Sequence, residues 1–321
     1  MNRGLLAALG AFLCWGVFPI YWKALDHVPA LEIVAHRLVW CCLWVVAFLF
    51  VTKGVAWLPA LLRRPRVLRN LTLSSALIGA NWFLYIWAVN SGHIVETSLG
   101  YFINPLVNVM FGVLLFSERL NRRQWLAIGV AAIGVAYMTA AHGRLPWIAL
   151  VLAASFGLYS VMRKVTDVES VPGLAWESAV YFPFAGLGLL WLAGTGEGAM
   201  AHVDWQTDLL LLLSGVLTAV PLILFAIAAR RVPLSTIGIM QYLAPTLQLL
   251  CGTLLYDEPF TPIEAVGFGC IWAALAIYTL DGLGSHWRRR ALARARPVDA
   301  LAAEPADAPT TGRFASDRDA S

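Results

Sequence analysis

The sequence carries little charge. Asp, Glu, Lys and Arg together make up 13% of its 321 residues, whereas about a quarter of an ordinary soluble domain is charged. Hydrophobic residues make up 60% of the chain, and the mean hydropathy is +0.71. This composition excludes an ordinary soluble domain and indicates an integral membrane protein.

Several chemical signatures are also missing. No Gly-rich loop followed by Lys and Ser or Thr is present, so we do not expect direct drive by ATP. All five cysteines lie in apolar runs without metal-ligand spacing, and we expect them to act as small hydrophobic side chains. We therefore expect no cofactor, no metal, no catalytic residue and no nucleic-acid partner. The expected partners are a small-molecule solute and membrane lipids, and the sequence leaves the oligomeric state open.

Long apolar runs recur along almost the whole chain. A helix needs about 20 residues to cross about 30 Å of hydrocarbon, and continuous runs predict helices rather than barrel strands. The first run extends from Gly4 to Trp22 without a clear signal-peptide cleavage site, so we predict it to be a span. The predicted fold is an all-α membrane protein with ten spans: 4–22, 33–52, 70–89, 95–116, 124–141, 146–162, 174–193, 207–229, 234–256 and 262–281.

The positions of Lys and Arg predict the orientation of these spans. If the N-terminus is cytoplasmic, nearly all Lys and Arg residues outside the spans fall on the cytoplasmic side, and the other side keeps only Lys23 and Arg144. Cytoplasmic loops characteristically retain positive charge. We therefore predict that both termini are cytoplasmic.

Two stretches of the chain resemble one another. In the first, Pro105 is followed by Gly112 and Glu118, and in the second Pro245 is followed by Gly252 and Glu258 at the same spacings. The second stretch lies five spans after the first. Because five is odd, we predict two repeats that cross the membrane in opposite directions. The predicted divisions are a first repeat at 1–142, a second at 143–285 and a disordered cytoplasmic tail at 286–321, basic and then polar.

Ionisable residues within predicted spans are costly and therefore informative. They are His36 and Arg37 in the second span, Glu96 at the start of the fourth and Glu177 in the seventh. These groups either lie near the interface and pair with one another, for example Arg37 with Glu96, or form a proton or charge relay.

Buried amides and neighbouring aromatic residues form a second set. An amide in a bilayer must hydrogen-bond another helix, water or a polar solute. Both helix-to-helix bonding and solute binding stay open for each amide. The candidate solute-binding residues are Asn81, Trp82, Tyr101, Asn104, Asn108, Gln241, Tyr242 and Gln248.

Four prolines interrupt the apolar runs. Pro19, Pro105, Pro221 and Pro245 are expected to break or kink their helices within the membrane. Because Pro105 and Pro245 occupy matching positions in the two repeats, we predict that they form a pair of hinges.

The strings SLGYFINPL (98–106) and QYLAPT (241–246) are the most specific parts of the sequence. With HR at 36–37 and GANWFLYIWAVNSGH at 79–93, the chain resembles a RarD-type member of the EamA branch of the drug/metabolite transporter superfamily over residues 4–282. The resemblance implies ten helices in two inverted five-helix repeats. It also implies a bacterial inner-membrane location, a central cavity, and export or exchange of small polar or amphipathic metabolites or drugs.

Three classes of function are compatible with these features. A secondary transporter moving its solute by alternating access is the predicted class, because two inverted halves give two nearly equivalent openings. Ion-coupled and facilitated transport both fit. An intramembrane enzyme using His36, Glu96 and Glu177 is an alternative, but no nucleophile elbow or dyad spacing accompanies them. A sensor without a transported solute is the third.

Overall fold

The structure is a computed structural model that describes residues 3–117, 119–229, 231 and 240–294. The chain divides into two units, Met1–Thr279 and Leu280–Ser321. The first unit holds almost all of the helices. The described part of the second unit is the continuation of the last helix.

Every regular element among the described residues is helical. The elements are α1 (Arg3–Gly16), α2 (Phe18–Lys23), α3 (Ala30–Lys53), α4 (Trp57–Leu62), α5 (Pro65–Asn90), α6 (Ile94–Phe116), α7 (Arg122–His142), α8 (Trp147–Val165), α9 (Ser170–Thr195), α10 (Trp205–Ala229), α12 (Leu243–Leu250), the π-helical turn η1 (Cys251–Leu255) and α13 (Pro262–Arg294).

Within the described ranges, nine stretches are long and apolar enough to cross a membrane. A shorter apolar helix, Leu243–Leu255, combines α12 and η1. These helices confirm the all-α membrane fold. Residues 234–239 of the predicted span 234–256 lie outside the described residues.

Prolines have different effects in different helices. The first membrane-spanning stretch, Arg3–Lys23, is interrupted between α1 and α2, and Pro19 lies in the first turn of α2. A proline is tolerated there because the first-turn amides have no intrahelical partner. Pro105 and Pro221 lie inside the continuous helices α6 and α10. The break predicted at Pro19 is therefore present, whereas α6 and α10 continue through their prolines.

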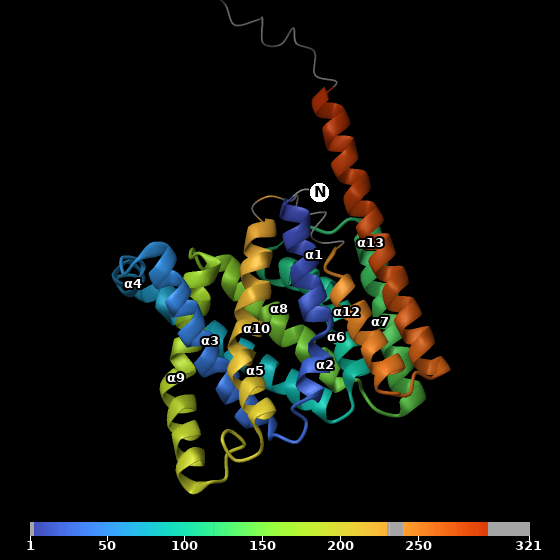
Figure 1. The fold of residues 1–321 in the computed structure, drawn as a ribbon. Coiled ribbons are helices and arrows are strands. Elements are labelled where there is room, and N and C mark those ends of the chain that lie inside the picture. Colours follow the sequence, from blue (N-terminus) through green and yellow to red (C-terminus); the bar gives the residue numbers. More distant parts are fainter. Residues whose placement is uncertain (1–2, 118, 230, 232–239, 295–321) are drawn as a thin grey trace, which may run out of the picture. The chain divides into compact units, whose positions relative to one another are not determined.

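The helices of the first unit pack in a continuous series. Helix α3 lies against α9 and α10, α10 against α1, and α8 against both α5 and α6 (Figure 1). At the other edge α7 faces the first turns of α13, where Phe268 and Ile271 join a core cluster with Ala127, Ala131 and Met138. The arrangement brings helices that are far apart in sequence around the polar residues of α3 and α5.

The contact between α3 and α10 depends on a glycine. A Cβ atom added at Gly215 of α10 would lie 2.3 Å from the backbone carbon of Trp40 and 2.5 Å from the backbone nitrogen of Cys41. Backbone atoms cannot move aside as a flexible side chain can. Small residues at such positions allow the close helix approach on which packing in membranes depends.

We expect Gly215→Ala to destabilise the protein, because overpacking forces the two helices apart. The loss should be about 1–3 kcal/mol, measured as a lower thermal midpoint in detergent. Gly186→Ala in α9 is the matched control, since nothing lies within 4 Å of a Cβ added there. Equal midpoints for the two variants would contradict this account of the α3–α10 contact.

Two parts of the chain differ from the predicted boundaries. The predicted loop from Lys53 to Arg69 contains the short helix α4 and the start of α5, neither of which the hydropathy pattern indicated. Helix α13 continues through Arg294, past the predicted start of the tail at His286. Residues 295–321, the rest of that tail, lie outside the described residues.

Candidate functional site

Arg37 is buried inside the helix bundle. Its side chain on α3 is 4% exposed, and its Nε donates a hydrogen bond to Thr218 Oγ1 of α10 at 2.9 Å. The guanidinium carbon lies 4.1 Å from the ring centroid of Trp82 and 5.1 Å from that of Trp22. Aromatic faces attract a cation through their negative quadrupole. Arg37 is therefore held mainly by aromatic rings and one neutral hydroxyl.

Further aromatic groups extend this cluster. The rings of Tyr85 and Tyr101 meet edge to face with centroids 5.6 Å apart, and Tyr101 meets Phe156 of α8 in the same way at 6.5 Å. Trp82 and Tyr101 were predicted from the sequence, whereas Trp22, Tyr85 and Thr218 were not. The four-residue spacing of Asn81 and Tyr85 on one helix face was a usable signal for Tyr85. No pattern in the sequence pointed to Thr218.

The pairing of Arg37 with Glu96, considered from the sequence, does not occur between these two described residues. Glu96 Oε1 instead accepts a hydrogen bond from the backbone N–H of Ile148 at 3.0 Å. Ile148 is in the first turn of α8, whose free N–H groups attract a carboxylate. The sequence indicated the depth of Glu96 but not the direction of its side chain.

His36 lies beside a carboxylate that the sequence analysis missed. Its Nε2 is 3.8 Å from Oε1 of Glu32, one helical turn earlier on α3. The same Glu32 oxygen accepts a hydrogen bond from the backbone N–H of Ala199 at 2.7 Å. Both side chains are buried. Glu32 therefore ties α3 to the connection between α9 and α10.

Glu177 is a buried carboxylate with several partners. Its oxygens accept hydrogen bonds from Ser74 Oγ at 2.5 Å and from Tyr159 OH at 3.2 Å. Arg163 Nη1 of α8 lies 3.6 Å from Oε1. A buried charge is tolerated when it is paired and hydrogen-bonded. This arrangement matches the alternative in which intramembrane polar groups pair with one another.

Two of the predicted amides join helices. Asn81 Nδ2 donates to Leu152 O at 3.0 Å and to Ser155 Oγ at 2.9 Å, linking α5 to α8. Gln248 Nε2 of α12 donates to Trp15 O of α1 at 3.0 Å. These bonds are the helix-to-helix contacts that the sequence analysis left open for each amide.

The remaining candidates lie in different surroundings. Tyr242 stacks on Phe102 with centroids 6.5 Å apart and hydrogen-bonds Gln241. Asn104 has a buried Oδ1 without a hydrogen-bond partner in the described structure, and Asn108 is half-buried on α6. Among these candidates, only Trp82 and Tyr101 lie in the aromatic cluster around Arg37.

The two predicted hinge prolines are not structurally equivalent. Pro105 lies inside α6, whereas Pro245 is only two residues after the start of α12. The interpretation of Pro245 as a mid-helix proline is therefore wrong. A proline in a first turn removes no intrahelical hydrogen bond. Instead, Pro245 O accepts a hydrogen bond from Ser98 Oγ of α6 at 2.8 Å, which connects the two helices.

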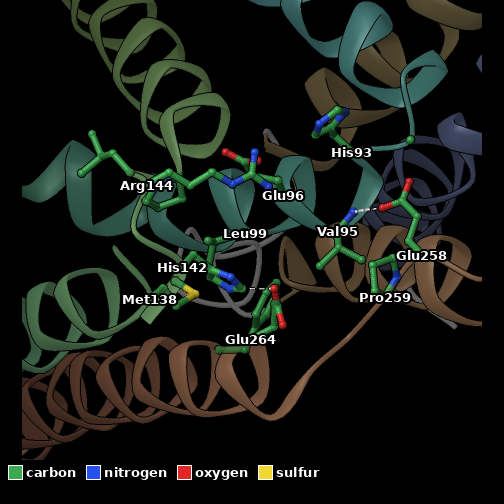
Figure 2. Close-up of a pocket in the computed structure, with 14 residues that line it drawn as sticks. His93, Val95, Glu96, Leu99, Met138, His142, Arg144, Glu258, Pro259 and Glu264 are labelled. Carbon is green, nitrogen blue, oxygen red and sulfur yellow. Dashed lines mark hydrogen bonds and ion pairs between the residues drawn. The ribbon is translucent and has the colours of Figure 1, made fainter. Parts of the chain in front are cut away.

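A pocket of about 140 Å³ lies where several helix ends and connections meet, and Figure 2 shows the residues that line it. It is bordered by the α5–α6 connection, the end of α7, the α7–α8 connection and the start of α13.

Two oxygens of Glu258, which lines this pocket, accept hydrogen bonds from the backbone N–H groups of Ile94 and Val95, each at 2.8 Å. His142 Nε2 lies 2.8 Å from Glu264 Oε1. Glu258 thus caps the N-terminus of α6, and Glu118, its predicted counterpart, lies outside the described residues.

We expect Glu258→Ala to destabilise the fold, because the first-turn N–H groups of α6 lose a carboxylate that binds two of them. The loss should be about 1–2 kcal/mol, seen as a lower thermal midpoint in detergent. Glu197→Ala removes an exposed carboxylate in the α9–α10 connection and serves as the control. A Glu258 variant as stable as the Glu197 variant would contradict the capping role.

Polar groups that could hold a metal do not gather in the described part of the chain. No cluster of three or more His, Cys, Asp or Glu side chains suited to a metal is found there. The buried polar groups instead occur singly or in small bonded sets between helices. Apolar spans that enclose such groups indicate a multi-pass membrane protein, and they are compatible with a transporter.

Comparison with known proteins supports this class. The model of the EamA-like transporter family matches residues 2–140 and again residues 145–280. Protein RarD of Streptomyces exfoliatus is 44% identical over 94% of this chain and 96% of its own length. An uncharacterized transporter of Vibrio cholerae is 42% identical over 90% of this chain and 96% of its own length. The chain therefore belongs to the EamA-like transporter family and is a multi-pass protein of the bacterial inner membrane.

Two further comparisons concern the fold and a relative's name. A protein of known crystal structure aligns with 86% of this chain and 97% of its own chain, with a TM-score of 0.56. The two sequences are 20% identical, so this comparison supports a shared fold. A Pseudomonas aeruginosa relative, 29% identical over 87% of this chain and 94% of its own length, is named chloramphenicol-sensitive protein RarD.

Proposed function

We propose that this protein is a secondary transporter that moves a small polar or amphipathic solute across the inner membrane by alternating access, in export or exchange. The observation that carries the proposal is the double match of one family model, at 2–140 and 145–280. Each half corresponds to five apolar segments. Since five is odd, the halves cross the membrane in opposite directions, which is the arrangement that gives inverted-repeat transporters two related openings.

The depth of the Arg37 cluster also supports this proposal. Arg37 lies about 10 Å from the start of α3, and Tyr101 lies about as far from the start of α6, at 1.5 Å per helical residue. Trp82 is at a similar distance from the end of α5. Lys23 Nζ at the end of α2 donates to Asn90 O at 3.2 Å, which places these helix ends together. The cluster is therefore buried inside the bundle, and we propose that the transported solute passes beside it.

We place both termini and the α3–α5 connection in the cytoplasm, because positive charge gathers around that connection. Lys53 ends α3, two arginines lie at 63–64 in the connection, and two more lie at 66 and 69 in the first turns of α5. The pocket in Figure 2 then faces the periplasm. On this placement, Asn104 and Asn108 of α6 lie progressively deeper than Tyr101. We propose that these two amides line the route beyond the cluster.

Transport is tested by reconstituting the full chain into liposomes and measuring flux of radiolabelled chloramphenicol and of a mixture of labelled metabolites. We expect at least one labelled compound to cross faster than in protein-free liposomes, with saturation at high concentration. Asn104→Leu should slow this flux with little change in folded yield, whereas Asn81→Leu should lower the yield by breaking the α5–α8 bonds. Chemical conversion of a probe without net flux would instead favour an intramembrane enzyme.

We further propose that the helix segments at Pro105 and Pro245 bend as the cavity opens to one side or the other. Pro105 weakens α6 internally, and Pro245 lies between the turn at residues 241–242 and the π-helical η1. We expect Pro105→Ala and Pro245→Ala to shift side-specific labelling of introduced cysteines at least twofold, in opposite directions. Labelling is measured in a cysteine-free background.

Pro183→Ala is the control for this experiment, because Pro183 lies inside α9 and is exposed. It should leave the labelling of both sides unchanged. If both substitutions shift labelling toward the same side, or if neither differs from Pro183→Ala, the two prolines are static features of packing.

A further inference from the structure

Arg37 is a buried cation without an anionic partner among the described residues. Its only hydrogen bond there is to the neutral Thr218 hydroxyl, and its Nη1 has no partner. The carboxylates of Glu32 and Glu96 are engaged elsewhere, since Glu32 binds Ala199 N and Glu96 binds Ile148 N. A cation at membrane depth is costly unless it is paired. The aromatic faces around Arg37 compensate only part of that cost.

Two more unpaired polar groups lie around the same guanidinium. The indole Nε1 of Trp22 and the hydroxyl of Tyr85 are buried without hydrogen-bond partners in the described structure. The Trp22 side chain is 0% exposed and Tyr85 is 2% exposed. Trp22 is in ring contact with Arg37. Tyr85 is three residues after Trp82, the other ring over Arg37, on the same face of α5, and it belongs to the same core cluster as Trp22. Groups from α2, α3 and α5 therefore leave hydrogen-bonding capacity unused around one positive charge.

The chemistry of these three groups is selective. A guanidinium and an indole N–H can only donate hydrogen bonds, and a phenol can donate one. A ligand that satisfies them must offer several acceptors, and one that also neutralises Arg37 must be an anion. The planar guanidinium fits carboxylate and phosphate oxygens particularly well. The ring of Tyr101 lies next to Tyr85 and that of Phe156 next to Tyr101, and both add apolar surface beside these groups.

We propose that Arg37, Trp22 and Tyr85 bind the oxyanion of a small organic solute, so that the substrates of this protein are organic anions. This inference rests on the transport function proposed above and specifies its substrate class. The oxyanion accepts hydrogen bonds from Arg37 Nη1, Trp22 Nε1 and Tyr85 OH, and the apolar body of the solute lies against the neighbouring aromatic rings.

The test compares ligands that differ only in the charged group. Phenylacetate supplies a carboxylate, phenyl phosphate supplies a phosphate, and phenylacetamide is a neutral counterpart of the first. Binding is measured by calorimetry and by the shift in thermal midpoint of the full-length protein in lipid nanodiscs. We expect at least one oxyanion to bind and raise the midpoint, and the amide to bind at least tenfold more weakly. The tighter of the two anions identifies carboxylate or phosphate as the preferred group.

Tyr85→Phe tests the site with little risk to the fold. Because the Tyr85 hydroxyl has no partner, its removal should leave the midpoint of the free protein unchanged and weaken anion binding about tenfold. Tyr181→Phe is the matched control, since the Tyr181 hydroxyl donates to Ser75 O at 3.0 Å. It should lower the midpoint and leave anion affinity unchanged.

Arg37 itself is tested by two substitutions. Arg37→Gln should abolish anion binding, and Arg37→Lys should retain weaker binding because it keeps the charge and loses the planar fork. Arg69→Gln, which removes an exposed guanidinium from α5, should bind as the unmodified protein does. If Arg37→Gln fails to fold, Tyr85→Phe still decides the question.

The inference is overturned if neither anion binds at millimolar concentration, if phenylacetate and phenylacetamide bind equally, or if Tyr85→Phe binds as tightly as Tyr181→Phe. These outcomes are separate from those for transport. Flux of a neutral solute without anion binding would overturn only the substrate class. Anion binding without flux of any labelled compound would overturn the transport function and leave the binding site in place.

Discussion

Within the hydrocarbon of a bilayer, a polar group has only other parts of the protein, trapped water or a solute to bind, and this constraint explains most of the contacts described here. Glu177 receives hydrogen bonds from two helices and an ion pair from Arg163. Asn81 bonds both a carbonyl and a hydroxyl of α8. Glu177 is bonded through both of its oxygens and Asn81 through its amide nitrogen, and these bonds hold neighbouring helices in fixed positions.

At one end of the bundle, carboxylates are used in a different way. Glu96 binds a backbone N–H in the first turn of α8, and Glu258 binds two such groups at the start of α6. The first N–H groups of a helix have no partner within it, and the helix dipole favours a negative charge beside them. Glu96 therefore joins α6 to the start of α8, and Glu258 joins the η1–α13 connection to the start of α6, without requiring a cation.

Hydropathy predicted where the helices lie in the sequence, but it did not predict which side chains meet between helices. The span from Ile94 to Phe116 was predicted to within one residue, because hydropathy reports directly on burial in lipid. Hydropathy does not report how a helix is rotated about its axis. Arg37 and Glu96 were predicted to lie at similar depths in the membrane, so that they could pair. Their side chains instead contact different helices, α10 and α8. Contacts such as Arg37 with Thr218 join residues far apart in the chain, and no local pattern encodes them.

The repeat in the sequence was informative about architecture and less so about individual positions. Pro105 and Pro245 match in spacing, but one lies within a long helix and the other near the start of a short one. Each repeat packs against the other, so matching residues meet different neighbours: Gln248 bonds α1, whereas Asn108 is half-buried on α6. Two copies of a motif share backbone tendencies, and their side chains then adapt to surroundings that are not copies.

The contrast between Glu177 and Arg37 separates two uses of a buried charge. Both are almost fully buried, but Glu177 has donors on α5 and α8, whereas Arg37 faces aromatic rings and one hydroxyl. Removing a fully paired charge leaves its partners without compensation, so such a pair stabilises one arrangement of helices. A charge that is only partly compensated stabilises no single arrangement strongly, and its energy falls when a complementary ligand arrives. In a protein that changes shape around its ligand, a ligand that binds such a partly compensated charge in one conformation more tightly than in the other shifts the conformational equilibrium.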